Sequence, residues 1–168
     1  MLNKNLIDVN SLIYSKNKSS KNWTNHNFLF QKISGILLDK LSELGEHFEN
    51  ILILSSDAGE CAEKINQISS KNLIFLSPFR NLLKRFNPVS KKILKIESSF
   101  EDLPFKSNKF DLIISNLYLH NVKNNQLHFK KLFEYLNKNG LLICNFYGEK
   151  TVHELTNSLF LADQFFVI

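Results

Sequence analysis

FDLIISNLYLHNV, which runs from Phe110 to Val122, is the stretch that decides the fold. Its first half, Phe110 to Ser115, is apolar apart from Asp111 and the final serine, and a short apolar run of this kind predicts a strand buried in a sheet. From Asn116 to His120 polar and aromatic residues alternate with two leucines, as in a loop that leaves a strand and faces a ligand. The stretch therefore predicts a buried strand that ends at a binding cleft.

Similar short apolar runs recur along the chain and alternate with patterns of helical period. Strands that are apolar on both faces and alternate with helices belong to parallel sheets covered on each side. The spacing between the runs leaves room for the crossover that parallel strands need. We predict a Rossmann-like, doubly wound α/β domain whose remaining strands are Ile51–Leu54, Leu73–Leu76, Ile93–Ile96 and Leu141–Phe146.

Apolar residues at intervals of three and four predict the helices. The first begins at Phe28 and ends near Gly45. Another, from Gln126 to Leu136, is ended by Asn139-Gly140. The other predicted helices are a stretch from Ala58 to Ile68, the segment from Phe79 to Phe86, and a last helix from about Thr151 to Gln164.

The amino-terminal segment has a different composition. Residues 1–27 are polar and rich in lysine, with a single apolar turn from Leu12 to Tyr14. Such a composition favours a mobile arm. We therefore predict a polar arm over residues 1–27 and a single domain over residues 28–168.

Composition narrows the classes of function. The excess of 21 basic over 16 acidic residues is mild, so nucleic-acid binding is not favoured. Cys61 and Cys144 lie far apart in apolar segments, which suggests neither a metal site nor a disulfide. No apolar run approaches the roughly 18 residues of a membrane span, and no signal peptide is evident, so the sequence predicts a cytoplasmic protein.

Several segments together carry a resemblance to a known family. They are Leu103-Pro104-Phe105, the stretch from Phe110 to His120, NGLLI from Asn139, FYGEKTVHEL from Phe146, and SLFLAD from Ser158. With these segments the chain resembles class I S-adenosylmethionine-dependent methyltransferases of type 11. More narrowly, it is similar to the family of the mitochondrial complex I assembly-factor methyltransferase-like protein, with malonyl-acyl-carrier-protein methyltransferases as cousins. The resemblance implies S-adenosylmethionine as cofactor, and methylation or arginine hydroxylation as activity.

The loop after the first strand departs from the family pattern. There the family has an acid at the strand end and then a glycine-rich turn, because the cofactor approaches the backbone closely. In this chain Ile53 stands in place of the acid, Ser55 and Asp57 replace glycines, and Gly59 remains. The spacing of Asp57 and Glu60 also matches a capping box, in which the helix caps itself. A carboxylate at that position would repel the carboxylate of the cofactor.

The other cofactor positions implied by the resemblance are also altered. Ser77 occupies the place of the acid that binds the ribose, and Ser99 that of the acid beside the adenine. If the loop shifts its register, Glu97 or Glu101 could substitute for Ser99. At the end of the strand that starts at Phe110, the remaining predicted cofactor contacts are Ser115 and Asn116.

His120 is the candidate catalytic residue, because histidine titrates near neutral pH and this one follows the strand end. A polar residue that closes the strand end by hydrogen bonding is the alternative interpretation. Asp111, at the start of the same strand, is expected to be structural.

Two functions follow from these observations. The first is an S-adenosylmethionine-dependent methyltransferase of unknown acceptor, for which a protein is one candidate. The second is a degenerate, non-catalytic relative that acts as a binding partner or in the assembly of a respiratory complex. The apolar strand from Leu141 to Phe146 and the closing Phe165-Phe166-Val167-Ile168 also suggest a surface that binds a second copy of the chain or another protein.

Overall fold

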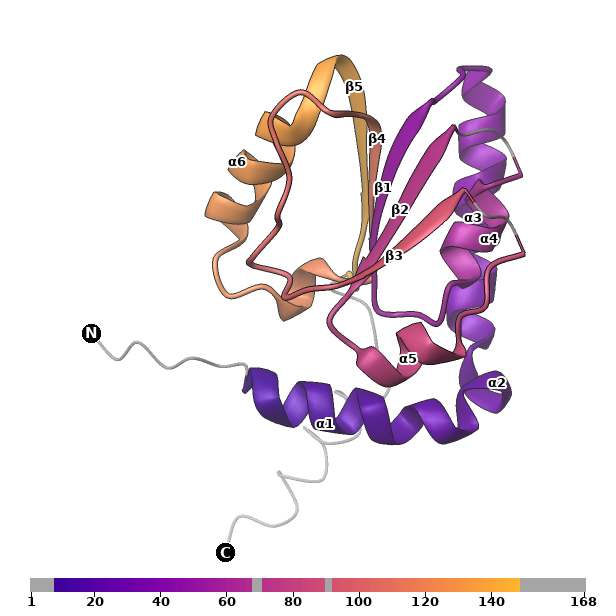
Figure 1. The fold of residues 1–168 in the computed structure, drawn as a ribbon. Helices are drawn as coiled ribbons and strands as arrows, with labels where there is room; N and C mark the ends of the chain where they lie inside the picture. Colours follow the sequence, from indigo (N-terminus) through magenta and orange to yellow (C-terminus); the bar gives the residue numbers. More distant parts are fainter. Residues whose placement is uncertain (1–7, 68–70, 90–91, 149–168) are drawn as a thin grey trace, which may run out of the picture.

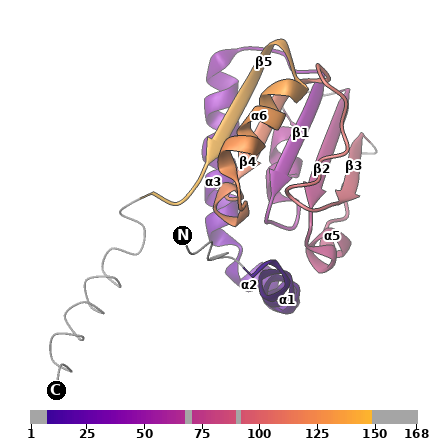
Figure 2. The same ribbon diagram turned by 90° about the vertical axis from the view of Figure 1, so that its left-hand side faces the viewer.

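A five-stranded sheet forms the centre of the molecule, and all of its strand pairs are parallel. The computed structural model describes residues 8–67, 71–89 and 92–148. The strand order is β3-β2-β1-β4-β5, which Figure 2 shows from β3 on one side to β5 on the other. Their bounds are β1 Asn50–Ser55, β2 Asn72–Ser77, β3 Ile93–Glu97, β4 Phe110–Asn116 and β5 Leu136–Asn145. The predicted doubly wound parallel sheet is therefore confirmed.

Helices cover both faces of the sheet (Figure 1). On one face, α3 (Phe28–Leu44) and α4 (Glu60–Ile65) pack over the side chains of Ile51, Ile53 and Ile114. On the other face, α6 (Asn125–Tyr135) covers the alternate set, which includes Leu52 and Ile113. One hydrophobic core thus lies on each face of the sheet. The strands β1 and β4 are apolar on both faces because their side chains contribute to both cores. Two short helices, α5 (Arg80–Arg85) and the 3-10 helix η2 (Leu119–Asn121), complete the connections.

The helix predicted from Phe28 ends as expected. It stops at Leu44, and Gly45 follows with a φ of 62°. That left-handed conformation costs glycine little and favours it just past a helix end.

The amino-terminal residues differ from the predicted mobile arm. Val9–Ser19 form a helix, α1, followed by the 3-10 helix η1 (Ser20–Asn22) and by α2 (Trp23–His26). Asp8 caps α1, because its carboxylate accepts hydrogen bonds from the backbone N–H groups of Asn10 and Ser11. Trp23 is buried and packs on Phe30, so this polar segment is ordered through a few apolar anchors.

The junction between α6 and β5 also differs from the prediction. The helix ends at Tyr135, and residues 136–140 belong to the strand instead of ending the helix at Asn139-Gly140. Phe110 pairs with Leu136 and Leu112 pairs with Leu141, so β5 carries an irregularity between these pairs. Tertiary pairing with β4 therefore decides the conformation of a segment that looks like a loop in sequence.

Asp111 holds the amino end of the sheet together. It accepts hydrogen bonds from the backbone N–H groups of Glu49 and Asn50 and from the side chain of Asn137. Burial alone would raise the pKa of this carboxyl, but the hydrogen bonds hold it below the usual value. Its predicted structural role is consistent with this position, at the sheet end opposite the carboxyl ends of the strands.

The predicted helix from Thr151 to Gln164 and the closing Phe165–Ile168 lie outside the described residues. Within the described ranges, none of the helices combines the length and the apolar character needed to cross a membrane.

Candidate functional site

The carboxyl ends of β1 and β4 bring three of the predicted site residues together. Ser55 lies opposite Asn116 in the parallel register, and Leu54 lies opposite Ser115. Ser55, Ser115 and Asn116 are fully buried. In a doubly wound sheet this edge is where ligands bind, so the predicted residues occupy the expected place.

Asp57 fills the loop between β1 and α4 with its own carboxylate. One oxygen accepts a hydrogen bond from Gly59 N at 2.8 Å. The other accepts from Cys61 N at 3.3 Å and from Asn116 Nδ2 at 3.1 Å. The side chain is completely buried. The interpretation of Asp57 as a cap of the helix therefore agrees with the structure, although the helix itself begins at Glu60.

Glu60 closes the same loop from the other side. Its Oε2 accepts a hydrogen bond from Ala58 N at 2.8 Å, which is the return contact that a capping box predicts, shifted by one residue. Its Oε1 accepts from Trp23 Nε1 at 2.6 Å and from Asn27 Nδ2 at 2.8 Å. Sequence reasoning did not find these two partners, because they lie more than 30 positions away in a segment that looked like a mobile arm.

The electrostatics of the loop oppose a further negative charge. Burial, and then the charge of Glu60, raise the pKa of Asp57 to about 6, while its hydrogen bonds act in the opposite direction. A third carboxylate placed here would meet two that are already present. The backbone N–H groups of Ala58, Gly59 and Cys61 thus have hydrogen-bond acceptors within the chain itself.

Gly59 is the glycine that the family pattern retains, and the structure shows what it accommodates. Its φ is 100°, and a Cβ built on it would lie 2.2 Å from the ring of Phe86. The space that a missing side chain leaves at this glycine is therefore occupied by a phenylalanine that follows α5.

A chain of amides continues from the loop to β5. Asn145 Nδ2 donates to Asn116 Oδ1 at 2.9 Å, and Asn145 Oδ1 accepts from Leu117 N at 2.6 Å. Leu117 has a φ of 48°, an uncommon conformation for a residue other than glycine. Both polar atoms of the Asn116 side chain are therefore hydrogen-bonded. Its Nδ2 donates to Asp57 and Ser55, and its Oδ1 accepts from Asn145.

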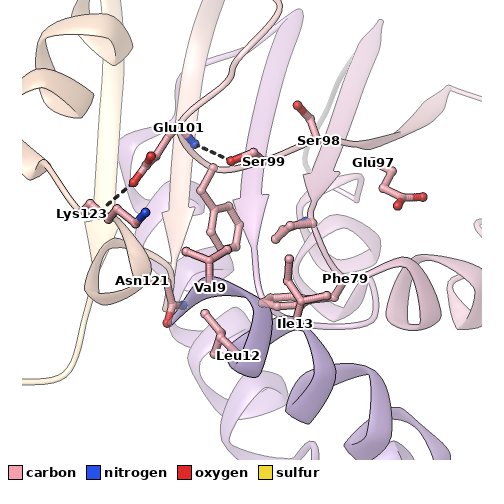
Figure 3. A pocket seen from close by; sticks show the side chains of 12 residues that line it. Val9, Leu12, Ile13, Phe79, Glu97, Ser98, Ser99, Glu101, Asn121 and Lys123 are labelled. Atoms are coloured by element: carbon pink, nitrogen blue, oxygen red, sulfur yellow. Dashed lines mark hydrogen bonds between the residues drawn. The ribbon is translucent and has the colours of Figure 1, made fainter. Parts of the chain in front are cut away.

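A separate cavity lies between α1 and the segments that follow β2, β3 and β4 (Figure 3). Its volume is about 490 Å³. Apolar side chains of α1 face Phe79 and Phe100 across it, and Glu97, Ser99 and Glu101 stand on its rim. Of the predicted cofactor residues only Ser99 lines this cavity, and its Oγ accepts a hydrogen bond from Glu101 N at 3.2 Å.

The two glutamates on the rim have partners. Arg80 Nε lies 2.9 Å from a carboxylate oxygen of Glu97, and Glu101 accepts from Lys123 N at 3.0 Å. Ser77 lies below the rim, buried at the end of β2, where its Oγ is 3.5 Å from Phe79 N. The predicted ribose and adenine positions are therefore split between the buried sheet end and the open cavity.

His120, the candidate catalytic residue, lies outside both places. It is exposed on η2, and its ring packs 4.8 Å from the ring of Tyr147, measured between centroids. Partial burial, and then the charge of Lys16, lower its pKa. It is not among the residues that line the cavity under α1.

The residues present do not fit the amino-acid end of S-adenosylmethionine. The N–H groups of Ala58, Gly59 and Cys61 already donate to Asp57 and Glu60. The face of Gly59 is filled by Phe86. The cavity under α1, in contrast, is open to a ligand.

The chain is similar to known methyltransferase domains and to arginine-hydroxylases. The family described as "Methyltransferase domain" matches residues 57–144. Human arginine-hydroxylase NDUFAF5, mitochondrial, is 26% identical over 153 residues, which are 87% of this chain and 44% of the human protein. The zebrafish (Danio rerio) protein of the same name is 23% identical over 160 residues, which are 89% of this chain and 49% of that protein. The chain thus spans less than half the length of these curated relatives.

Solved structures share the fold at low sequence identity. A putative S-adenosyl-L-methionine-dependent methyltransferase from Methanococcus maripaludis has a TM-score of 0.69 at 15% identity, covering 88% of this chain and 71% of that one. A putative methyltransferase in complex with the activator Trm112, from Haloferax volcanii, has a TM-score of 0.60 at 16% identity, covering 64% of this chain and 50% of that one. At such identities the likeness concerns the fold alone.

Proposed function

Since the chain belongs to the methyltransferase domain family, we propose that it is a non-catalytic member of that family that acts by binding another protein. The observation that carries this proposal is the self-filled loop between β1 and α4. There Asp57 and Glu60 take up the backbone N–H groups that would otherwise be free for a ligand carboxylate.

Displacing these groups would be costly. Hydrogen bonds to a charged group contribute about 1.5–3 kcal/mol each, and a buried carboxylate that loses its donors keeps the full cost of its desolvation. A ligand carboxylate would also be repelled by any carboxylate that stayed in place. The self-filled loop therefore favours a protein that keeps the methyltransferase fold without using its cofactor loop.

A protein partner is part of the proposal. The curated relatives are named arginine-hydroxylases, and the solved structure from Haloferax volcanii is a complex with an activator protein. By analogy we propose that this chain contacts a protein, such as a component of a respiratory complex under assembly, or a second copy of itself. The names of the relatives place those proteins in mitochondria, whereas a cytoplasmic location is our proposal for this chain.

The open cavity under α1 favours a second candidate, an S-adenosylmethionine-dependent methyltransferase with an unknown acceptor. Methyl transfer requires mainly that the acceptor be held in line with the methyl group, so this candidate does not depend on a general base. In that case Ser99 and the neighbouring rim residues would contact the ligand, and the loop at Asp57 would have to rearrange.

Calorimetric titration with S-adenosylmethionine and with S-adenosylhomocysteine distinguishes the two candidates. We expect no saturable heat at ligand concentrations of about 1 mM, the level at which a binding free energy near −4 kcal/mol would be detected. A dissociation constant of about 1 μM, or −8 kcal/mol, would contradict the non-catalytic proposal and support the enzyme.

A matched pair of variants shows whether the loop is responsible. Asp57→Gly removes the carboxylate that fills the loop. Glu63→Gln removes a carboxylate from α4, the helix after that loop, where Glu63 accepts a hydrogen bond from Val89 N. If the filled loop alone prevents binding, heat should appear in Asp57→Gly and not in Glu63→Gln. Silence in both variants would mean that further losses, such as those at Ser77 and Ser99, also matter.

A further inference from the structure

α1 is a cover over the cavity and contributes little to the deep core. It runs along the carboxyl ends of the strands, and Val9, Leu12 and Ile13 form one wall of the cavity (Figures 1 and 3). None of its residues is fully buried. A helix attached in this way can separate from the sheet without unfolding the two cores.

Two contacts tie α1 to its surroundings near its carboxyl end. Asn17 accepts hydrogen bonds from Asn81 N at 3.0 Å and from Asn81 Nδ2 at 3.3 Å, both at exposed positions. Lys16 Nζ lies 5.4 Å above the ring of Phe30. The hydrogen bonds between Asn17 and Asn81 are exposed and therefore weak, whereas Lys16 is half-buried and packs on the buried ring of Phe30.

A stronger attachment lies directly after α1. Trp23, the first residue of α2, and Asn27, which follows α2, both donate to Glu60 Oε1, while Glu60 Oε2 accepts from Ala58 N in the loop after β1. One partly buried carboxylate therefore joins the segment that follows α1 to the loop at the end of β1.

We propose that Glu60 is a latch that holds α1 over the cavity and couples the opening of this cover to the state of the β1–α4 loop. When the loop moves, the carboxylate cannot keep its contacts with Trp23 and Asn27 as well as its contact with Ala58. The segment after α1 then loses its anchor, and α1 separates from the cavity. The coupling acts in both directions, so displacement of α1 loosens the loop.

The chemistry of the latch requires a carboxylate. A glutamine at position 60 has one oxygen and one amide group. Whichever way it turns, its N–H groups face either Ala58 N–H or the donors of Trp23 and Asn27. Glu60→Gln therefore breaks one side of the latch while preserving the shape of the side chain.

Hydrogen exchange followed by mass spectrometry on the full chain tests the latch. In Glu60→Gln we expect the amides of Val9–Ser19 to exchange at least about tenfold faster, the factor set by one lost bond to a charged group. Trp23 is the single tryptophan of the chain, so its fluorescence should shift to the red as the indole loses its partner and gains water. Exchange in β1 and β4 should stay unchanged.

Two further variants make the outcome decisive. Trp23→Phe removes the indole donor and leaves the contact between Glu60 and Ala58, so it should speed exchange in α1 even if Glu60→Gln fails to fold. Glu63→Gln removes the same charge from α4 without touching Trp23 or Asn27, and should leave exchange in α1 as in the parent.

Unchanged exchange of α1 in both Glu60→Gln and Trp23→Phe would overturn the latch, and so would equal acceleration in Glu63→Gln. These measurements contain no cofactor. Their failure is thus distinguishable from failure of the proposed non-catalytic function, which the calorimetric titration decides.

Discussion

Asp57 and His128 are two buried ionisable groups whose pKa values move in opposite senses. Burial, and then the charge of Glu60, raise the pKa of Asp57 from 3.8 to about 6. Burial, and then the charge of Lys131, lower the pKa of His128 from 6.5 to about 4. Both groups change charge over the same acidic range, so their effects on the free energy of unfolding oppose one another in the parent protein.

For Asp57 the folded state binds the proton more tightly than the unfolded state. Its contribution to stability is therefore present in full below pH 3.8 and is lost as the pH rises to about 6. In Asp57→Asn this loss disappears. We expect the parent to become less stable relative to the variant across that range, by about 3 kcal/mol.

Urea unfolding of the two proteins at a series of pH values measures the difference. Asp39→Asn, a change of the same kind on the exposed surface of α3, is the control and should run parallel to the parent. A constant difference between the parent and Asp57→Asn at all pH values would show that Asp57 does not titrate in this range.

The pKa shift of His128 affects the pH dependence of stability in the opposite direction to that of Asp57. The unfolded state binds the proton more tightly, so stability is lost as the pH falls from 6.5 towards 4. Neither ring nitrogen has a hydrogen-bond partner among the described residues, and the ring packs against Tyr118. His128→Phe keeps the aromatic packing and removes the buried polar atoms, so we expect a gain of about 1 kcal/mol at neutral pH.

The same variant should lose the acid sensitivity that His128 causes. Thermal or urea unfolding above and below pH 6.5 measures both effects, with the exposed His26→Gln as control. Destabilisation of His128→Phe at neutral pH would mean that the ring nitrogens have partners, such as bound water, that the protein needs.

At the scale of elements, Gly140 controls the irregular start of β5. A Cβ at this position would lie 2.9 Å from Leu136 Cδ2, 3.0 Å from the carbonyl oxygen of Phe110 and 3.1 Å from that of Asn137. Backbone atoms cannot move aside as a side chain can, so Gly140→Ala should cost about 1–3 kcal/mol in the free energy of unfolding. Gly148→Ala, where no atom lies within 4 Å of the new Cβ, should cost little.

Denaturation curves for the two alanine variants test this role. Equal stability of both would mean that the bulge between Phe110 and Leu112 relaxes without cost.

The elements that could be predicted from sequence are those whose own residues show the pattern of a strand or a helix without regard to distant contacts. The strands Ile93–Glu97 and Phe110–Asn116 agree with the prediction to within one residue, because a continuous apolar run between polar segments predicts a buried strand. The start of β5 was not found, since Asn137, Lys138 and Asn139 look like a turn and become strand only by pairing with β4.

The helix α1 differs from the predicted mobile arm, although part of a helical signal is present in its sequence. Val9, Leu12 and Ile13 have helical spacing, and Asp8 followed by Ser11 marks a helix start. The high content of lysine and asparagine outweighed these signs. Its stability depends on the anchors at Trp23 and Asn27, which sequence spacing cannot reveal.

In the candidate site, too, some contacts could be predicted from the sequence and others could not. The adjacency of Ser55, Asp57 and Asn116 follows from the parallel order of the strands, and the capping role of Asp57 follows from its spacing to Glu60. The contact of Phe86 with Gly59 could not be predicted, because it joins two separate crossover connections of the sheet. Contacts of this second kind are the ones that fill the cofactor loop.

At the scale of the whole molecule, β5 is the last strand of the described sheet and has an unusual composition. Residues 139–147 contain neither a charged residue nor a proline, although edge strands are usually protected by such residues. Phe133 and Phe146 are each 61% exposed, and a groove of about 590 Å³ runs between α6 and β5. This combination is typical of a surface that binds another protein.

We therefore expect self-association through this surface. Light scattering should give a mass above 19.5 kDa that rises with protein concentration. Phe146→Lys places a charge at the end of β5 and should return the protein to the monomer, because a charge at this edge opposes pairing of two strands. Phe28→Lys changes an aromatic residue that is 74% exposed on α3 and should leave the mass unchanged. A monomeric mass of the parent at every concentration would contradict self-association and leave a different protein as the partner of this surface.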